Sequence, residues 1–81
     1  MQDLENKPLS YIAEIIRVNW NNPSPYAVPY IDAMAQLRSI NDNYYADSGE
    51  SVVMRFLCNA QTWRGDTARA VKAHLNKLAV K

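Results

Sequence analysis

Cysteine is almost missing from this sequence. Cys58 is the single cysteine, so no disulfide can form within the chain, and we expect its thiol to be buried as a small apolar group. There is no uninterrupted run of about 18 apolar residues, the length that a membrane-spanning helix requires. The first residues carry acidic groups and lack the apolar stretch of a secretory signal. These absences predict a soluble protein of a reducing compartment, the cytoplasm, without contact to a membrane.

Catalytic and metal-binding residue types are also scarce. With one histidine, one cysteine and two glycines, the chain has no nucleophile, base and orienting partner, and no glycine-rich phosphate loop. The ligand sets that hold zinc and the alternating acidic residues of calcium loops do not occur. His74 is expected to be a half-buried, hydrogen-bonded side chain. The sequence therefore predicts that the protein is not an enzyme and needs no cofactor.

The residues that are present are typical of one small folded unit. The chain has 81 residues, 48 % of them hydrophobic, and a formal net charge of +1. This length leaves no room for a second core, and the composition is that of a packed domain rather than a disordered one. We predict a single helical domain over residues 1–81, with residues 1–7 as a flexible N-terminal segment.

Residues 9–20 repeat apolar side chains at steps of three and four, as on one face of an amphipathic helix. A second apolar side of the same segment carries Tyr11, Ile15 and Val18. A helix with two apolar sides is expected to lie centrally among the other helices. Alternatively, its second side meets another protein chain, which includes a second copy of this one.

Further segments also have the period of a helix. They are residues 29–40, 49–59 and 63–79. The asparagine- and proline-rich residues 21–25 and the polar residues 41–48 are predicted to be loops. No stretch alternates with a period of two for long enough to predict a strand. The predicted fold class is all-α, a compact bundle of about four short helices.

Polar residues mark the expected helix ends. Asp47 or Ser48 can cap the third helix and Thr62 the fourth. Asp32 is expected in the first turn of the second helix, where it would favour the helix dipole. The last two helices are separated by only two or three residues in this prediction, which indicates a tight helical hairpin.

Charge is unevenly distributed along the chain. Residues 1–51 hold three basic residues against seven carboxylates, whereas residues 52–81 hold six basic residues against Asp66 alone. The last helix is therefore expected to present a basic binding face, with Trp63 at its entry. Its members are Arg64, Arg69, Lys72 and Lys77. Such a face can contact the phosphates of nucleic acid or an acidic protein surface. Alternatively, these are ordinary solvated charges and Trp63 is a core residue.

A second candidate surface is aromatic and apolar. Its residues are Tyr11, Ile15, Val18, Tyr26, Tyr44 and Tyr45. Aromatic side chains are favoured anchors of protein interfaces, although tyrosines also cap small cores with the ring buried and the hydroxyl in water. The sequence leaves both explanations open and places protein interaction slightly ahead of nucleic-acid binding.

Several short motifs together resemble a known group of proteins. They are Trp20, YAVPYIDAM at residues 26–34, Leu37, DSG at residues 47–49, NAQTWRG at residues 59–65, Ala68, Lys72 and Leu75. This set, above all the TWRG stretch in front of a basic helix, resembles small uncharacterised proteins encoded by bacteriophages and mobile elements. The resemblance implies an origin in a phage or bacterial cytoplasm and brings no catalytic residue.

The expected function combines these observations. We predict a non-enzymatic phage or mobile-element accessory protein, a small protein–protein interaction module that modulates a bacterial host protein. The alternative is a DNA-binding protein that uses the basic helix over residues 63–79.

Overall fold

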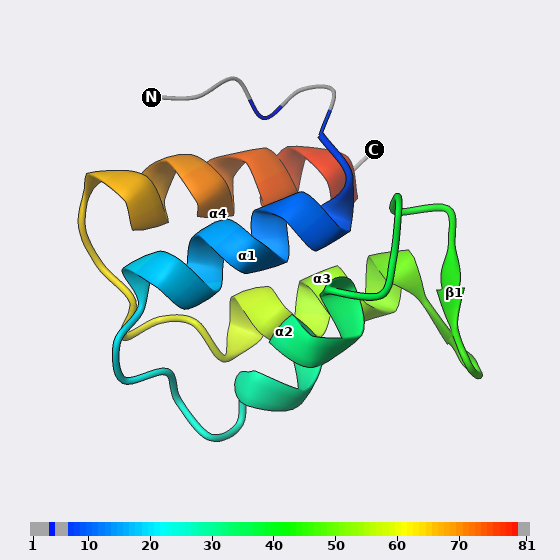
Figure 1. Ribbon diagram of the computed structural model, residues 1–81, viewed down its shortest axis with the longest axis horizontal. Coiled ribbons are helices and arrows are strands. Elements are labelled where there is room, and N and C mark those ends of the chain that lie inside the picture. The colour runs from blue at the N-terminus through cyan, green and yellow to red at the C-terminus, as the bar shows by residue number, and fades with distance from the viewer. Residues whose placement is uncertain (1–3, 5–6, 80–81) are drawn as a thin grey trace.

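The computed structural model describes Leu4 and residues 7–79, and these residues form four helices and one small sheet (Figure 1). In chain order the elements are α1 (Leu9–Asn19), α2 (Val28–Met34), β1 (Asn43–Tyr44), β2 (Asp47–Ser48), α3 (Gly49–Cys58) and α4 (Asp66–Ala79). The prediction of a mainly helical fold is confirmed. An all-α class is wrong, because the expected loop at residues 41–48 contains the two strands.

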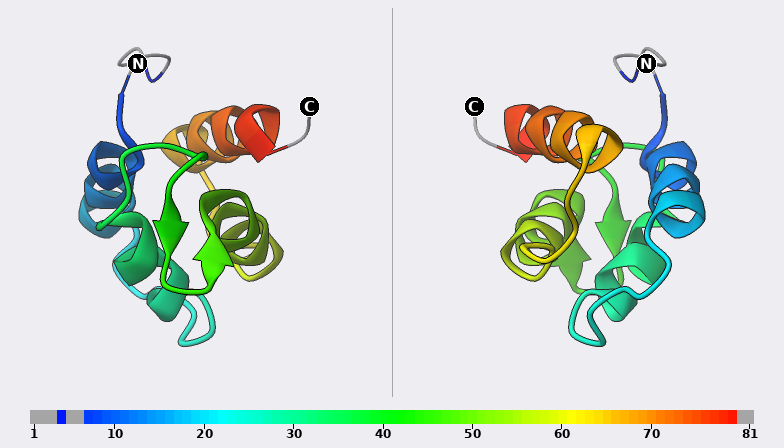
Figure 2. Two further views of the ribbon diagram at one scale, coloured as in Figure 1. Left: turned by 90° about the vertical axis from the view of Figure 1, so that its right-hand side faces the viewer. Right: turned by 90° about the vertical axis from the view of Figure 1, so that its left-hand side faces the viewer.

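The helices close a ring around the core. Each packs against two others, in the order α1, α2, α3, α4 and back to α1. Viewed along the long axis of the molecule, the two-strand hairpin stands at one end, between α2 and α3 (Figure 2). α1 is therefore one member of the ring and not the central helix that its two apolar sides predicted. On its second side Tyr11 and Ile15 are half-buried against the core, and Val18 is 69 % exposed.

The core is built from the apolar faces that the sequence period predicts. Its largest fully buried side chains are Phe56, Leu9, Ile12, Ile16, Met34, Leu75, Val52, Val53 and Val71. Phe56 stands edge-on to two indole rings, with centroids 6.3 Å from Trp20 and 6.5 Å from Trp63. Edge-on contacts suit the charge distribution of aromatic rings and add to the gain from burying them.

The start of α1 is completed by a distant part of the chain. Pro8 provides no side-chain cap, but Leu9 N donates to Arg38 O and Ser10 N donates to Leu37 O, both at 2.9 Å. These bonds satisfy N–H groups that have no partner within α1. The predicted helix over residues 29–40 is too long, because α2 ends at Met34 and the chain then tightens into turns before residues 37 and 38 meet the start of α1.

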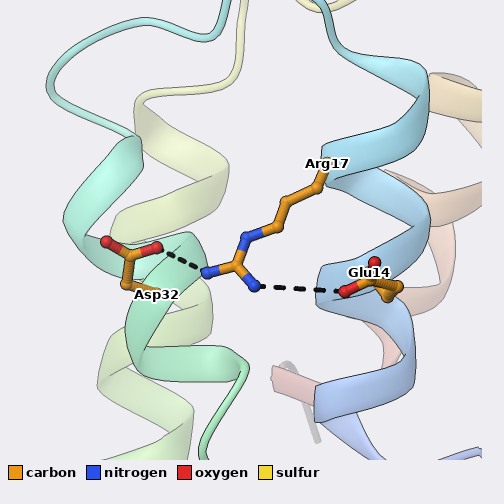
Figure 3. A network of polar contacts seen from close by, with 3 residues as sticks. All are labelled: Glu14, Arg17 and Asp32. Atoms are coloured by element: carbon orange, nitrogen blue, oxygen red, sulfur yellow. Dashed lines mark hydrogen bonds and ion pairs between the residues drawn. The ribbon is translucent and has the colours of Figure 1, made fainter.

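Asp32 also differs from its prediction. It lies beyond the first turn of α2 and pairs with α1 instead, where Arg17 Nη2 is 2.6 Å from Asp32 Oδ1 (Figure 3). Arg17 also faces Glu14 at 4.0 Å on its own helix. These side chains are exposed, so the pairs add at most about 1 kcal/mol to stability. Of the two, only the pair with Asp32 links α1 to α2.

The hairpin leads directly into α3. In it Asn43 lies opposite Ser48 and Tyr44 opposite Asp47, and Tyr45 in the turn has a φ of 56°, which is uncommon for an aromatic residue. Ser48 is the N-cap of α3, because its Oγ accepts from Ser51 N at 3.1 Å. The prediction of this cap and of the start of α3 is confirmed.

The connection between α3 and α4 is longer than predicted. α4 begins at Asp66 rather than at Trp63, and Thr62 is exposed in the connection and does not cap the helix. The first bond of α4 runs from Arg69 N to Gly65 O at 2.9 Å. The helices still pack directly on each other, but the link of two or three residues is wrong, because Trp63 leaves the helix to enter the core.

The expected flexible segment over residues 1–7 lies largely outside the described residues. Of the two that are described, Leu4 is buried in the core, and Lys7 Nζ lies 5.1 Å from the ring centroid of Tyr11. The described N-terminal residues therefore contact the folded helices.

Candidate functional site

An open hollow of about 380 Å³ lies where the connection after α3 enters α4. Its walls come from the connection and from the first two turns of α4. The lining residues are Gln61, Trp63, Arg64, Gly65, Arg69 and Lys72. In Figure 1 this junction lies at the end of the molecule opposite the hairpin. Half of the lining residues are cationic, and we call this depression the basic hollow. It is the strongest candidate for a binding site.

Trp63 forms the floor on which the basic hollow is built. Its ring is 3 % exposed and stacks on Trp20 at a centroid distance of 5.6 Å and an interplanar angle of 14°. Its Nε1 donates to Asn19 O at 3.4 Å, which ties the connection to the end of α1. Trp63 is therefore a core residue, as one of the two explanations from the sequence proposed. Because its contacts hold Trp63 in place, they also position the backbone of the adjacent Arg64.

Gly65 turns the chain from the connection into α4. Its φ of 114° lies in a region that side-chain-bearing residues rarely adopt. A Cβ there would meet no atom within 4 Å, so the backbone angle and not crowding requires glycine. The turn lets residues on both sides of it line the same hollow, Arg64 before it and Arg69 after it.

The electrostatics of the basic hollow are dominated by cations that face one another. Partial burial, and secondly repulsion from Arg64, lower the pKa of Lys72 below its ordinary value. Arg69 Nη2 is 3.8 Å from Asp66 Oδ1, but both side chains are highly exposed and the pair is weak. The hollow thus gathers positive charge that a bound anion would compensate.

The structure brings together most of the predicted basic face. Arg64, Arg69 and Lys72 line the hollow, whereas Lys77 lies near the other end of α4 and does not line it. Sequence reasoning missed Gln61 and Gly65 as lining residues. Gly65 carried a usable signal, since a glycine directly before a helix marks a special backbone angle. Gln61 carried no such signal.

The predicted aromatic surface is divided. Tyr11 and Ile15 are half-buried against the core of the helix ring, so they offer little exposed area. Tyr26 is 74 % exposed near the start of α2, while Tyr45 is 86 % exposed at the tip of the hairpin, with Tyr44 at 4.7 Å between ring centroids. Figure 1 shows the hairpin projecting at one end, away from the loop between α1 and α2. The set does not form one continuous face.

Two other reactive side chains lie outside the hollow. Cys58 is exposed at the end of α3, which contradicts the prediction of a buried thiol, because its position falls outside the core-facing stripe of the helix. His74 is half-buried on α4, as expected. Within Leu4 and residues 7–79, no cluster of His, Cys, Asp or Glu is arranged to hold a metal ion.

A second, smaller depression of about 220 Å³ lies beside the start of α3. Its lining residues are Ile40, Asn41, Ser48 and Glu50. Ser48 Oγ is already the acceptor of the helix cap. This depression therefore offers less to a ligand than the basic hollow does.

None of the four helices in the described part of the chain combines the length and apolar character needed to cross a bilayer. Comparison with known proteins found no match to this chain: no family model, no curated protein and no solved structure. The functional assignment therefore depends on the geometry of the basic hollow.

Proposed function

We propose that this protein is a non-enzymatic interaction module that binds a short acidic segment of a partner protein in the basic hollow. The observation that carries the proposal is the convergence of Arg64, Arg69 and Lys72, from both sides of the Gly65 turn, on one open depression. Cations that repel one another in a partly enclosed site favour an anionic ligand, and field lines are concentrated in such a depression.

The distribution of the remaining charge supports a short ligand over a long polyanion. Arg17 is close to Glu14 and Asp32, and Arg55 Nη1 is 3.7 Å from Asp47 Oδ1. Positive charge on Arg17 and Arg55 is thereby partly offset, whereas Arg64, Arg69 and Lys72 form a short cluster rather than a track along the molecule. Nucleic-acid affinity grows with the number of phosphates neutralised, which requires cations spread along a track.

Apolar surface near the hollow also suits a protein partner. Val18, which is 69 % exposed, is the neighbour of Asn19, and Asn19 O accepts the indole N–H of Trp63. An acidic segment held by the cations can therefore continue onto an apolar side chain at the same end of the molecule. Protein interfaces combine an apolar centre with a charged rim in this way.

The test is a titration with a fluorescent oligoglutamate peptide at about 50 mM salt, followed by anisotropy. We expect binding that weakens as salt rises, and Arg64→Glu, Arg69→Glu and Lys72→Glu each to weaken it about tenfold, which corresponds to about 1.4 kcal/mol. Lys77→Glu is the matched control: it makes the same charge change on α4 outside the hollow, and we expect less than about a twofold effect.

Three results would count against the proposal. Absence of peptide binding, or equal losses for Lys77→Glu and Lys72→Glu, would remove the basic hollow as the site. Tighter binding of a DNA duplex than of the peptide, with Lys77 contributing as much as Lys72, would favour the alternative of a DNA-binding protein that uses the whole of α4. The resemblance to small phage and mobile-element proteins supports a bacterial host protein as the source of the acidic segment.

A further inference from the structure

The charge and shape of the basic hollow point beyond a general acidic ligand. We propose that the hollow selects a dianionic phosphate monoester, carried on a side chain of the partner segment, over a carboxylate. This inference rests on the proposed function, because it names the group that the acidic partner would insert. Three features of the hollow support this preference: its charge, the number and type of its donors, and the exposure of its cations.

The first feature is the balance of charge. Arg64, Arg69 and Lys72 bring three positive charges to the lining, which contains no carboxylate; Asp66, 3.8 Å from Arg69, has a fully exposed side chain and does not line the hollow. A carboxylate ligand would bring one negative charge. A phosphate monoester brings about 1.5 to 2 at neutral pH, so it compensates more of the repulsion among the cations.

The pKa of Lys72 is consistent with repulsion between two of these cations. After partial burial, Arg64 is the second cause that lowers the pKa of the Lys72 ammonium. The two side chains come from different segments, the connection and α4, and the Gly65 turn brings them together. The structure thus keeps two cations close enough to repel each other, and this cost falls as the charge of a bound anion rises.

The second feature is the number and type of the donors. Two guanidinium groups and one ammonium group line the hollow, Arg64 from the connection before Gly65, and Arg69 and Lys72 from α4 after it. A phosphate monoester presents three terminal oxygens arranged around phosphorus, and guanidinium groups bind such oxygens in pairs. A planar carboxylate has two oxygens and cannot face all three cations equally.

The third feature is access. The hollow is open, and Arg64 and Arg69 are exposed, so a phosphate on a flexible side chain can enter without displacing the core. Trp63 underneath stays in its stack with Trp20. We therefore expect binding without a change of fold.

The experiment compares three otherwise identical acidic peptides, with phosphoserine, glutamate or serine at the central position, by isothermal titration calorimetry and amide NMR on the full chain. We expect the phosphoserine peptide to bind about tenfold more tightly than the glutamate peptide, with amide shifts at Gly65, Asp66 and Thr67. Lowering the pH from about 7.5 to about 5.5 crosses the second phosphate pKa near 6, so the preference should shrink.

Variants test whether the basic hollow causes the preference for the phosphoserine peptide. Arg64→Gln and Lys72→Gln should reduce the ratio between the two peptides to near one, while Lys77→Gln should leave the ratio unchanged. Unchanged thermal unfolding and an unchanged amide spectrum outside the hollow show that each variant remains folded. Inorganic phosphate at millimolar concentration should compete with the phosphoserine peptide in the wild-type protein only.

The outcomes separate this inference from the proposed function. If the glutamate peptide binds as tightly as the phosphoserine peptide, the preference for phosphate is overturned and the acidic-segment function stands. If neither peptide binds above the level of the Arg64→Glu variant, both proposals fall. If an oligonucleotide with a terminal phosphate outcompetes the phosphoserine peptide, the phosphate carrier is a nucleic acid, which also overturns the inference.

Discussion

Side chains around the basic hollow differ in how deeply they are buried and in how many contacts hold them in place. Trp63 is buried, stacked and hydrogen-bonded, whereas Arg64 and Arg69 are exposed and owe their position to the backbone that carries them. Lys72 is intermediate, since it is half-buried and its ammonium group is repelled by Arg64. The binding chemistry of the hollow is therefore carried by exposed cations next to a buried aromatic residue.

Lys72 should titrate below the ordinary range of lysine, because partial burial and Arg64 both disfavour its charged form. Arg64→Gln should raise the pKa of Lys72 only part of the way, since burial is the larger cause. The pKa is measured from the side-chain NMR shifts of Lys72 as a function of pH. Arg38→Gln, an equal charge change on a segment that does not line the hollow, is the control and should leave the pKa in place.

The same shift has a consequence for stability. Because the pKa of Lys72 is lower in the folded chain, the unfolded chain binds more protons at alkaline pH, so this residue makes folding more favourable as the pH rises from the lowered pKa to the ordinary one. Lys72→Met should remove that contribution. An unaltered alkaline profile in this variant, or a Lys72 pKa above the ordinary range, would contradict the assignment.

Helix ends are set by close contacts as much as by propensity. α3 begins at Gly49 because Gly49 N donates to Asp42 O at 2.7 Å and the loop before the hairpin passes directly over this position. Asp42 also accepts from Arg38 N through its side chain at 2.8 Å. One loop residue thus joins the end of the α2 region to the start of α3.

The variant Gly49→Ala tests whether helix propensity or the close contact with the loop determines stability at this position. Alanine is favoured over glycine within helices by about 1 kcal/mol, which would stabilise the protein. The added Cβ would, however, lie 2.8 Å from Ile40 O and 2.9 Å from Ser39 O, backbone atoms that cannot easily move. We expect a net loss of about 1–3 kcal/mol in the free energy of unfolding, measured with urea.

Ser51→Ala serves as the control for Gly49→Ala. It lies in the same turn of α3, offers its backbone N–H rather than its side chain to the Ser48 cap, and adds no Cβ. We expect a change within about 0.5 kcal/mol. A Gly49→Ala protein as stable as the wild type would show that the loop over residues 39–42 can shift.

The whole molecule is joined at the cluster of Trp20, Phe56 and Trp63. These rings come from the end of α1, from α3 and from the connection to α4, and their mutual distances are 5.6–6.5 Å. The cluster lies directly beneath the basic hollow, so stability of the ring of helices and presentation of the cations depend on the same residues.

Trp63→Ala should lower the free energy of unfolding by about 3–5 kcal/mol, because it leaves a cavity and removes the hydrogen bond to Asn19 O. This loss is a large fraction of the about 5–15 kcal/mol typical of small domains, so partial unfolding is expected even without denaturant. Tyr26→Ala, which removes an aromatic ring that is 74 % exposed, should change stability by at most about 0.5 kcal/mol. Equal effects of the two changes in chemical denaturation would refute the role of the cluster.

Local patterns in the sequence were sufficient for several elements. The apolar periods of α1 and α3 coincide with their buried faces, and the Ser48 cap forms as its residue type predicts. These features depend on residues a few positions apart, and a helix repeats its environment over that distance. The presence of Arg64, Arg69 and Lys72 near one helix was visible for the same reason.

Features that depend on contacts between residues far apart in the sequence could not be predicted from local patterns. The end of α2 depends on the hydrogen bonds that Leu9 N and Ser10 N donate to the carbonyls of residues 38 and 37. The start of α4 depends on the stacking of Trp63 on Trp20, which keeps Trp63 out of the helix. The hairpin followed no local signal that favoured its observed state. For Cys58 the helical period did carry a signal, because residue 58 lies outside the stripe of Val52, Val53 and Phe56, but the usual burial of free cysteine was given more weight.

Composition and period therefore specified a small, mainly helical chain with one basic helix, because they reflect the local demand to bury apolar groups and expose charges. The folded structure decided where the chain turns and which charges meet. Only packing of the indole of Trp63 against α1 and α3, followed by the Gly65 turn, brings Arg64 to the side of Lys72 and makes one hollow from two segments.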